Sequence, residues 1–347
     1  MSNTITLKIA AIQQETPDAI TIQFEKPENF IYQSGQFLTL ILNIKGEEVK
    51  RSYSFSSSPY TDQNPSITVK KIAGGLVSNY LNLNAYEGMQ ISALPPLGNF
   101  TIVPTQQKRN IVLIAAGSGI TPLFSMAKTI LSQEPESKVN LLLANRTEGS
   151  IIFKNAIAAL KNEQFNAIHT LSKPESTWNG KTERISKENI ARFLTQFDLE
   201  NIQAAEYYLC GPEAMMENVI AGLNDLGVDL NNIKKEKFTA AASNSSTHSV
   251  SPSTATTKST VTATLKNVTY TFEVDENETI LEAGKNAGID MPCACENGVC
   301  TACMAFCTAG IIDMEGNDTL NKNEIAKGQV LLCCGYAKSK EINLVYK

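Results

Sequence analysis

The sequence predicts a multidomain protein: an antiparallel β-barrel first, an α/β domain with a parallel sheet second, and a small domain rich in cysteine last. Three observations lead to this prediction. The first hundred residues hold short strand-like runs between turn residues, which is typical of antiparallel barrels. From Asn110 onward strands alternate with helices, as in a parallel α/β sheet. A Ser/Thr/Ala-rich tract then precedes a segment that holds seven of the eight cysteines.

The barrel is predicted over residues 1–106. Residues 20–24 alternate between apolar and polar side chains, residues 37–42 form a compact apolar run, and residues 66–69 follow a proline turn. Such short runs, bounded by turn signals and with few helical patterns between them, favour antiparallel strands.

The α/β domain is predicted over residues 107–238. Its predicted strands are 111–115, 139–143, 167–171 and 206–210, and its predicted helices start at about Pro122 and lie near 151–160. Strands that alternate with helices indicate a parallel sheet. His169 lies in the third strand, and we interpret it as a packing residue because no clustered metal-binding partner is visible.

Residues 239–260 form a low-complexity Ser/Thr/Ala tract. Such a tract cannot bury a hydrophobic core, so we expect a flexible linker, with His248 as an inert member of it. We therefore expect the segment after this linker, residues 261–347, to fold separately from the barrel and the α/β domain.

The net negative charge of the chain comes from this last segment. The formal net charge is −5, and residues 261–347 hold 7 basic and 12 acidic side chains, whereas the rest of the chain holds 23 of each. This distribution argues against a nucleic-acid-binding role, which needs a basic face, so no nucleic-acid partner is expected. The acidic excess suits docking against a basic partner surface, and an ordinary solvated acidic surface remains the alternative.

The cysteine content and the N-terminal sequence predict the cellular compartment of the protein. Eight cysteines without an export signal indicate a reducing compartment, so we expect a cytoplasmic protein without a disulfide framework. No stretch approaches the roughly 20 apolar residues of a membrane span, so no membrane partner is expected.

The cysteine spacing predicts a [2Fe–2S] cluster. Cys295, Cys300 and Cys303 have the spacing C-x4-C-x2-C, and twenty-nine residues separate Cys303 from Cys333. Two irons need four thiolates, and a loop with Gly298 at its turn can supply three of them while a distant strand supplies the fourth.

Two alternatives accompany this assignment. A zinc site would use the same thiolates but usually needs two C-x2-C pairs, and the chain has one. Cys334 adjoins the assigned fourth ligand, so the register is open by one residue; we assign Cys333. Cys293 and Cys307 are further thiols without an assigned role.

The residues around these cysteines resemble a plant-type ferredoxin domain. The resemblance covers about the last 87 residues and is carried by Met291-Pro292, Leu320, Gly328 and the Val330–Cys333 run. It implies an α+β fold of the β-grasp type over residues 261–347.

Two short motifs in the barrel together resemble the flavin site of the ferredoxin–NADP reductase family: Arg51-Ser-Tyr-Ser54, and a glycine pair that opens Gly74-Gly-Leu-Val-Ser78. The resemblance implies that Arg51 pairs with the FAD pyrophosphate, Tyr53 packs against the flavin, and Ser54 hydrogen-bonds near flavin N5. It also implies that Gly74 and Gly75 let the backbone approach the pyrophosphate, with Val77 and Ser78 as donors. Turn glycines and a surface arginine are the alternative.

In the α/β domain, Gly117-Ser-Gly119-Ile-Thr121-Pro122 follows the first strand and opens its helix. A helix N-terminus offers free amides and a positive dipole end to a pyrophosphate, and a proline in the first turn loses no hydrogen bond. The motif differs from the dehydrogenase G-x-G-x-x-G and is similar to that of the reductase family.

The same family resemblance extends to the carboxyl ends of the later strands. It implies that Cys210-Gly211-Pro212 lies beside the nicotinamide, that Glu236 acts at the same site, and that Phe238 covers the flavin face. A buried strand thiol for Cys210 and ordinary core packing for Phe238 are the alternatives.

The residues after the second strand of this domain bear on nucleotide choice. Asn145-Arg146-Thr147 stands where an adenosine ribose is read, and no acid lies directly at the strand end, although Glu148 is near. Arg146, with Lys154 as a further candidate, could accept a 2′-phosphate. We therefore expect NADPH to be preferred, with NADH as the alternative.

The domain order is similar to that of reductases that serve oxygenases. Residues 115–122, 145–147 and 210–216 resemble the reductase subunits of ring-1,2-phenylacetyl-CoA epoxidases most, and reductases of Rieske-type oxygenases or hybrid-cluster proteins are the runner-up. The resemblance implies an enzyme that passes electrons from NADPH through FAD and a [2Fe–2S] cluster to oxygenase subunits. A non-catalytic redox-sensing module is the alternative from another class.

Overall fold

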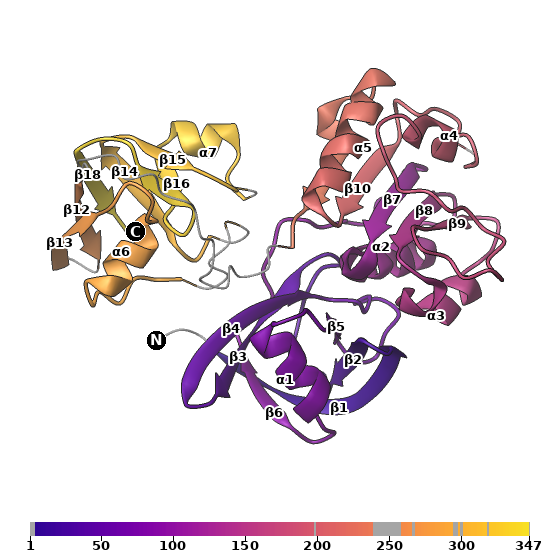
Figure 1. Cartoon of the computed structure of the whole chain (residues 1–347), viewed down its shortest axis with the longest axis horizontal. Coiled ribbons are helices and arrows are strands. Elements are labelled where there is room, and N and C mark those ends of the chain that lie inside the picture. Colours follow the sequence, from indigo (N-terminus) through magenta and orange to yellow (C-terminus); the bar gives the residue numbers. More distant parts are fainter. Residues whose placement is uncertain are drawn as a thin grey trace. The chain divides into compact units, whose positions relative to one another are not determined.

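The computed structural model describes residues 4–197, 199–238, 258–265, 268–293, 298, 301–317 and 319–346 (Figure 1). The chain divides into two compact units, Met1–Phe238 and Thr239–Lys347. No helix among the described residues combines the length and the apolar character that crossing a membrane requires.

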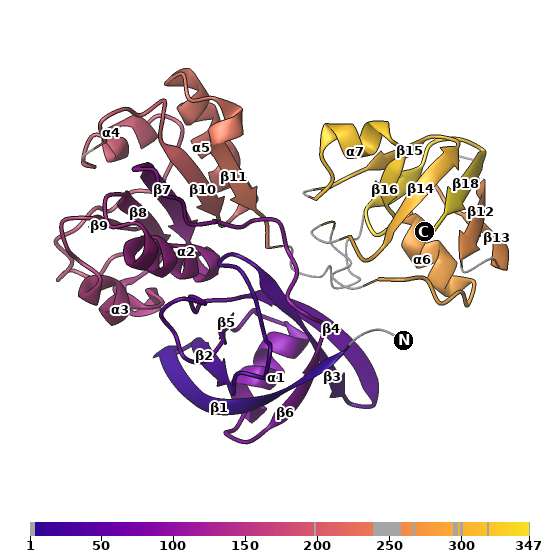
Figure 2. The same ribbon diagram turned by 180° about the vertical axis from the view of Figure 1, so that it is seen from behind.

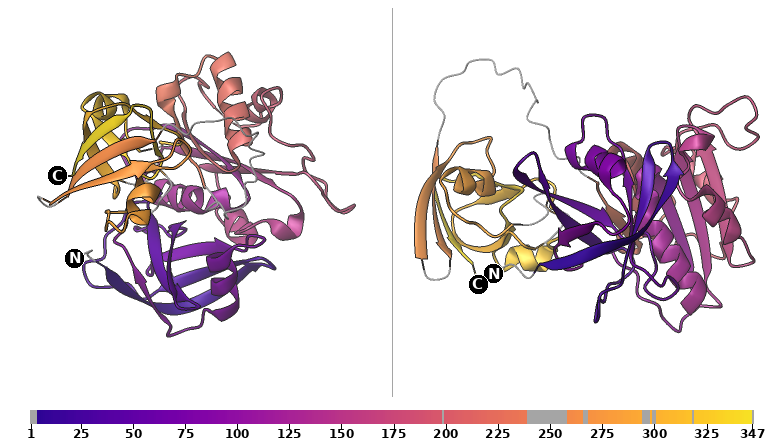
Figure 3. Two further views of the ribbon diagram at one scale, coloured as in Figure 1. Left: turned by 60° about the vertical axis from the view of Figure 1, so that its left-hand side comes forward. Right: turned by 90° about the horizontal axis from the view of Figure 1, so that it is seen from below.

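The first part of the first unit is an antiparallel six-stranded sheet in the order β4-β3-β6-β1-β2-β5. Its strands are β1 (Ile5–Thr16), β2 (Ala19–Phe24), β3 (Phe37–Ile44), β4 (Glu47–Ser54), β5 (Ser66–Lys70) and β6 (Gln90–Ala93). An antiparallel bridge between Phe55 and Ile67 joins the end of β4 to β5, so the two edge strands meet and the sheet closes. The strands curve accordingly in both views of Figure 3. The predicted antiparallel barrel is confirmed.

The second part of this unit is a parallel five-stranded sheet in the order β11-β10-β7-β8-β9. Its strands are β7 (Asn110–Ala116), β8 (Lys138–Asn145), β9 (Phe165–Leu171), β10 (Glu206–Cys210) and β11 (Ile233–Glu236), the last labelled in Figure 2. Its central strands are almost continuously apolar, because helices cover both faces of a parallel sheet. The predicted α/β domain is confirmed.

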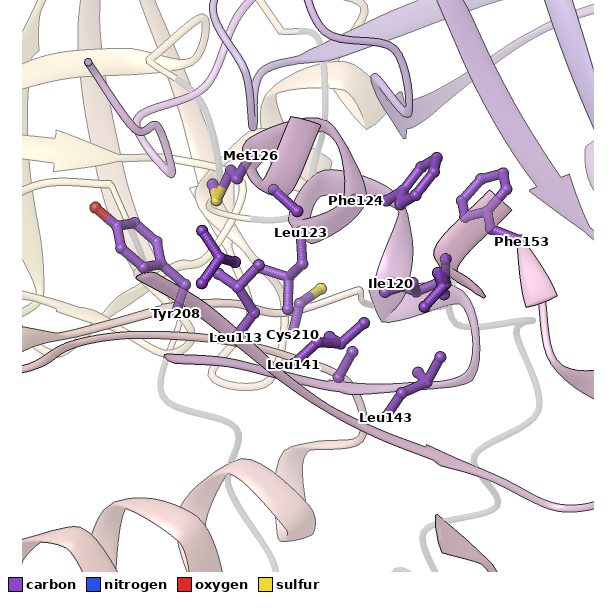
Figure 4. Packing of buried hydrophobic residues seen from close by; sticks show 14 of the residues in the cluster. Leu113, Ile120, Leu123, Phe124, Met126, Leu141, Leu143, Phe153, Tyr208 and Cys210 are labelled. Carbon is purple, nitrogen blue, oxygen red and sulfur yellow. The ribbon is translucent and has the colours of Figure 1, made fainter. Parts of the chain in front are cut away.

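The two faces of this sheet have separate hydrophobic layers. On one face, α2 (Ile120–Gln133) and α3 (Lys154–Ala159) pack on alternate strand residues such as Leu113 and Leu141, as Figure 4 shows. On the other face, α4 (Ile190–Leu194) and α5 (Glu213–Asp225) pack on the intervening residues, among them Val112 and Leu142. His169 of β9 is half-buried, and burial, with the charge of Lys154, lowers its pKa.

Helix α3 is shorter than the sequence pattern predicts. The pattern spans 151–160, but the helix runs over Lys154–Ala159 because Phe153 adopts a left-handed conformation with φ of 62°. The ring of Phe153 is stacked on Phe124 of α2 with centroids 4.5 Å apart. The aromatic contact therefore holds a backbone conformation that a bulky residue rarely adopts.

Buried hydroxyl groups join the barrel to α2. Ser34 Oγ and Ser58 Oγ lie 2.5 and 2.7 Å from Thr129 Oγ1, and Ser125 Oγ donates to the Ser57 carbonyl at 2.5 Å. All five side chains are buried. Buried polar groups that are fully paired favour one arrangement of the surfaces they join, so the two parts of this unit are held in a fixed orientation.

The second unit has a mixed five-stranded sheet in the order β13-β12-β18-β14-β16 and a separate β15-β17 pair. Its elements are β12 (Ser259–Leu265), β13 (Val268–Val274), α6 (Ile280–Asn286), β14 (Met304–Ala309), β15 (Ile312–Met314), α7 (Lys322–Ala326), β16 (Gln329–Leu331), β17 (Gly335–Ala337) and β18 (Glu341–Val345). Helix α6 begins with a capping box in which Thr279 and Glu282 each bind the other's backbone N–H. The helix packs its apolar side on the sheet, which confirms the predicted α+β fold.

Candidate functional site

The carboxyl ends of the parallel strands bring together residues from three distant segments. In the strand register Cys210 lies between Ala115 of β7 and Glu236 of β11. Ser54, at the end of barrel strand β4, donates a hydrogen bond from Oγ to Glu236 Oε2 at 3.1 Å. Ligands of open α/β sheets bind at this edge. The three residues that the resemblance names for catalysis therefore meet at one place.

This place is shielded from solvent. Ser54 is 4% exposed and Glu236 is 7% exposed. Burial raises the pKa of the Cys210 thiol well above its usual value, and the charge of Glu236 raises it further. Cys210 is therefore a neutral thiol rather than a thiolate.

The thiol of Cys210 packs in the hydrophobic layer beneath α2, as Figure 4 shows, and is fully buried. Its backbone, in contrast, contacts the turn that follows β7, at the carboxyl ends of the two strands. A Cβ added to Gly119 would lie only 2.1 Å from the Cys210 carbonyl oxygen, and one added to Gly211 would lie 3.1 Å from Ala116 Cβ. The absence of side chains at both glycines lets the two turns touch.

The turn after β7 leads into a helix N-terminus suited to an anion. Gly117 has φ of 55°, and Gly119 is the N-cap of α2, without a side-chain hydrogen bond to the cap among the described residues. Thr121 Oγ1 donates to the Ser118 carbonyl at 3.0 Å, and Pro122 lies in the first turn, where its missing N–H is not needed. The Ile120 N–H already donates to the Gly117 and Ser118 carbonyl oxygens, so the amides at this helix start that suit a phosphate are those of the glycine turn Gly117–Gly119 before it.

The flavin motif begins on β4, which pairs with β3. Arg51 is opposite Leu40 and Tyr53 is opposite Leu38, so their side chains share one face of the sheet. Both are half-buried, and burial raises the pKa of Tyr53, although the charge of Arg51 opposes this. The pair offers an arginine fork beside an aromatic ring.

The second flavin motif forms the start of α1 (Leu76–Asn84). Gly74 has φ of 73° and no described atom within 4 Å of the place where a Cβ would be. At Gly75 a Cβ would lie 2.6 Å from Ser78 Oγ. Val77 and Ser78 are buried in the first turn, and Ser78 Oγ accepts a hydrogen bond from the Ile72 N–H at 3.2 Å. An open glycine backbone and a helix start lie next to each other, as phosphate binding requires.

Two further predicted residues lie on the surface. Phe238 is 43% exposed, so it is not a core residue. Arg146 is exposed just beyond β8, whereas Lys154 Nζ already lies 2.6 Å from Glu148 Oε1. Of the two basic side chains considered for a 2′-phosphate, Lys154 is thus paired with an acid.

Sequence reasoning missed Lys70, which belongs to barrel strand β5. Its Nζ lies 3.9 Å from the position of a Cβ on Gly117, beside the glycine turn, and 3.7 Å from Asp18 Oδ2. No sequence signal links a barrel strand to this turn, because the contact arises from the packing of the two parts of the unit.

The cysteine site in the second unit is described in part. Cys295 and Cys300 lie outside the described residues, whereas Cys303, Cys333 and Cys334 are buried in one cluster. Cys333 Sγ accepts a hydrogen bond from the Gly298 N–H at 3.2 Å. Cys334 Sγ lies 3.7 Å from the Leu331 carbonyl oxygen.

Gly298 itself is in a position that only glycine fits. Its φ is 71°, and a Cβ there would lie 2.3 Å from the Gly316 carbonyl oxygen. Thr319 Oγ1 donates to the Gly298 carbonyl at 2.8 Å. A tight glycine turn with an amide directed at a thiol sulfur, next to buried soft ligands, fits an iron–sulfur cluster.

Three family models match the chain in succession. They are an oxidoreductase FAD-binding domain over residues 6–102, an oxidoreductase NAD-binding domain over 113–220, and a 2Fe-2S iron-sulfur cluster binding domain over 263–338. The predicted cofactors FAD, a nicotinamide nucleotide and a [2Fe–2S] cluster are therefore confirmed.

Curated relatives match over nearly the whole chain. A subunit of 1,2-phenylacetyl-CoA epoxidase from Escherichia coli (strain K12) is 33% identical over 94% of this chain and 93% of its own length. The ferredoxin reductase component of 3-ketosteroid-9-alpha-monooxygenase from Rhodococcus rhodochrous is 31% identical, over 96% and 94%.

Among solved structures, phthalate dioxygenase reductase aligns with a TM-score of 0.62 and 23% identity, over 99% of this chain and 98% of that chain. This likeness shows the shared fold. Together with the relatives and the three domain matches it confirms the predicted family resemblance. The chain therefore belongs to the family of oxidoreductases in which an FAD-binding domain, an NAD-binding domain and a C-terminal [2Fe–2S] ferredoxin domain follow one another.

Proposed function

We propose that this protein is the reductase component of a multicomponent oxygenase and that it oxidises NADPH and delivers single electrons to the oxygenase subunits. The observation that carries the proposal is the meeting of Ser54, Glu236 and the Cys210 backbone at the strand ends, between an arginine-and-glycine site on the barrel and a glycine turn on the sheet. A cysteine-ligated domain follows in the same chain. One polypeptide thereby combines the sites for a hydride-donating nucleotide, for a flavin and for a one-electron iron–sulfur centre.

In this proposal bound FAD supplies the exchange between a two-electron hydride donor and one-electron acceptors. The Ser54 hydroxyl would serve the N5 side of the flavin, and Glu236 holds that hydroxyl in one orientation by accepting its hydrogen bond. The low exposure of both side chains excludes water from the place where a hydride would pass. Through its backbone contact with Gly119, Cys210 positions the turn that is proposed to bind the nicotinamide nucleotide. Its buried neutral thiol adds no charge at this place.

The phosphate groups are assigned to the two glycine turns. On the barrel, Arg51 and the backbone from Gly74 to Ser78, with the amides of Val77 and Ser78, would hold the FAD pyrophosphate, and Tyr53 would pack on the flavin. On the sheet, the nicotinamide pyrophosphate lies at the start of α2, among Gly117, Gly119, Thr121 and Pro122, with Gly211 and Pro212 next to it. Phe238 is exposed beyond β11, where it would cover the flavin face in the absence of nicotinamide.

The cluster ligands in this proposal are Cys295, Cys300, Cys303 and Cys333. The Gly298 N–H that points at Cys333 Sγ supports the choice of Cys333 over Cys334. The proposed domains are residues 1–106, which bind FAD, and residues 107–238, which bind the nicotinamide nucleotide. Residues 239–260 form the linker, and residues 261–347 hold the cluster. The thiol-rich composition favours a reducing, cytoplasmic location.

Within the family we propose the phenylacetyl-CoA epoxidase as the oxygenase partner. The relative named for that enzyme matches over most of both chains, and the acidic excess of residues 261–347 suits a basic docking surface on a partner. A reductase of a Rieske-type oxygenase is the runner-up.

Reconstitution tests the partner. We mix the protein and NADPH with purified oxygenase subunits of phenylacetyl-CoA epoxidase or, separately, of 3-ketosteroid-9-alpha-monooxygenase, and measure product per NADPH oxidised. We expect coupled turnover with the epoxidase subunits and uncoupled oxidation with the others. Coupling with the monooxygenase alone would overturn the proposed partner, and coupling with neither would exclude both.

Nucleotide preference gives a mutational prediction. We expect Arg146→Ala to lower kcat/KM for NADPH by roughly ten- to a hundredfold, because a hydrogen bond to a charged group contributes about 1.5–3 kcal/mol. The same variant should leave kcat/KM for NADH nearly unchanged, since NADH lacks the 2′-phosphate. Steady-state kinetics with both nucleotides provide the measurement.

Lys154→Ala is the matched control for this prediction. Because Lys154 already pairs with Glu148 at 2.6 Å, its removal should change the NADPH-to-NADH ratio much less. If the wild-type protein prefers NADH, or if Arg146→Ala affects both nucleotides equally, the preference for NADPH is wrong.

A further inference from the structure

Tyr346 places a phenol in the layer that holds the cysteines of the second unit. Its side chain packs against a core that includes Cys303 and Cys333, and its backbone N–H donates to the Thr264 carbonyl at 3.0 Å, just beyond the end of β18. The position of the residue is therefore fixed by the sheet, from the backbone and from the packed ring.

The strand register directs this side chain toward Cys303. Phe306 of β14 pairs with Val345 of β18 in an antiparallel ladder, so continuing the register by one residue sets Tyr346 opposite Ala305. Directly opposite residues of an antiparallel pair have side chains on the same face, and alternate residues along a strand share that face. Cys303, two residues before Ala305, thus lies on the face to which Tyr346 points.

The hydroxyl group at the end of this ring is a buried donor. Tyr346 Oη is inaccessible to solvent and has no hydrogen-bond partner among the residues that the structure describes. A tyrosine hydroxyl ordinarily keeps its proton at neutral pH, so this group is a hydrogen-bond donor. A buried hydroxyl without a partner is unfavourable, so a nearby acceptor is expected.

We propose that the Tyr346 hydroxyl donates a hydrogen bond to a sulfur of the [2Fe–2S] centre on its Cys303 side and thereby raises the reduction potential of the cluster. Reduction adds one negative charge to the centre, and a hydrogen bond to sulfur stabilises the more negative form more strongly. Tyr346 acts here as a positioning and tuning residue, and it is not a ligand. The inference rests on the ligand assignment proposed above, with Cys303 among the ligands.

The test is a redox titration of the full-length holoprotein, followed by the electron paramagnetic resonance signal of the reduced cluster. For Tyr346→Phe we expect full iron and sulfide content and a roughly tenfold lower equilibrium constant for cluster reduction, which is about 59 mV more negative for one electron. Tyr270→Phe is the matched control, because Tyr270 lies on edge strand β13 and is 37% exposed. That variant should leave the potential unchanged.

A second variant keeps the proposal testable if the phenylalanine variant does not hold the cluster. Incorporation of 3,5-difluorotyrosine at position 346 retains the ring and the hydroxyl but makes the hydroxyl a stronger donor, so the potential should become less negative. An unchanged potential in a fully loaded variant of either kind would overturn the role of Tyr346. A wild-type protein without iron and sulfide would instead overturn the ligand assignment, so the two failures are distinguishable.

Discussion

Cys333→Ser is expected to abolish the iron–sulfur cluster, whereas Cys334→Ser leaves it in place. Each wild-type chain should hold about two irons and two acid-labile sulfides, the content of a [2Fe–2S] centre. A serine oxygen is a harder ligand and binds the cluster irons poorly, so Cys333→Ser should retain close to none of either. The structure supports this choice because Cys333 Sγ accepts the Gly298 N–H, while Cys334 Sγ lies near the Leu331 carbonyl.

The measurement is iron, sulfide and flavin analysis of the purified variants, with visible absorbance as a second readout. Both variants should keep FAD, which binds in the other compact unit, so FAD content reports on correct folding of the rest of the chain. The reverse pattern, with the cluster lost in Cys334→Ser and kept in Cys333→Ser, would move the fourth ligand by one residue.

Gly119→Ala is expected to lower kcat/KM for NADPH by about a hundredfold. The new Cβ would lie 2.1 Å from the Cys210 carbonyl oxygen and 2.9 Å from the Gly211 amide nitrogen, and neither backbone can move without displacing its turn. A shift of about 1 Å at a hydride-transfer site costs on that order. FAD content should stay near that of the wild-type protein, because the barrel glycines are unaffected.

Gly149→Ala is the control for this prediction. It makes the same chemical change in the same domain, but no described atom lies within 4 Å of the added Cβ. Its kcat/KM should stay within about twofold of the wild-type value. If Gly119→Ala is as active as Gly149→Ala, then the contact between the two turns does not position the nucleotide.

Local patterns in the sequence predicted most of the fold. Glu206–Cys210 is predicted and observed as a strand, and the turn from Gly117 to Gly119 follows a strand and opens a helix as expected. Each of these features depends on a few consecutive residues. Helix α3 departs from the prediction because its start is set by the stacking of Phe153 on Phe124, which is a tertiary contact.

Contacts between segments that are far apart in the chain could not be predicted from the sequence. Lys70 reaches the glycine turn only because the barrel packs against α2, and Tyr346 reaches the cysteine layer only because β18 pairs with β14. The Ser54–Glu236 hydrogen bond joins residues 182 positions apart. A family resemblance could name both residues, but their separation was not accessible from any local pattern.

The most direct test of the account is the choice of electron acceptor by the cluster-free protein. We compare NADPH-dependent reduction of ferricyanide and of cytochrome c by the wild-type protein, Cys333→Ser and Cys334→Ser. If hydride transfer takes place in Met1–Phe238 and single electrons leave through the cluster, Cys333→Ser should reduce ferricyanide within about twofold of wild type and cytochrome c at least about tenfold more slowly. Equal cytochrome c reduction by Cys333→Ser and the wild-type protein would contradict the account, as would loss of ferricyanide reduction in a variant that still holds FAD.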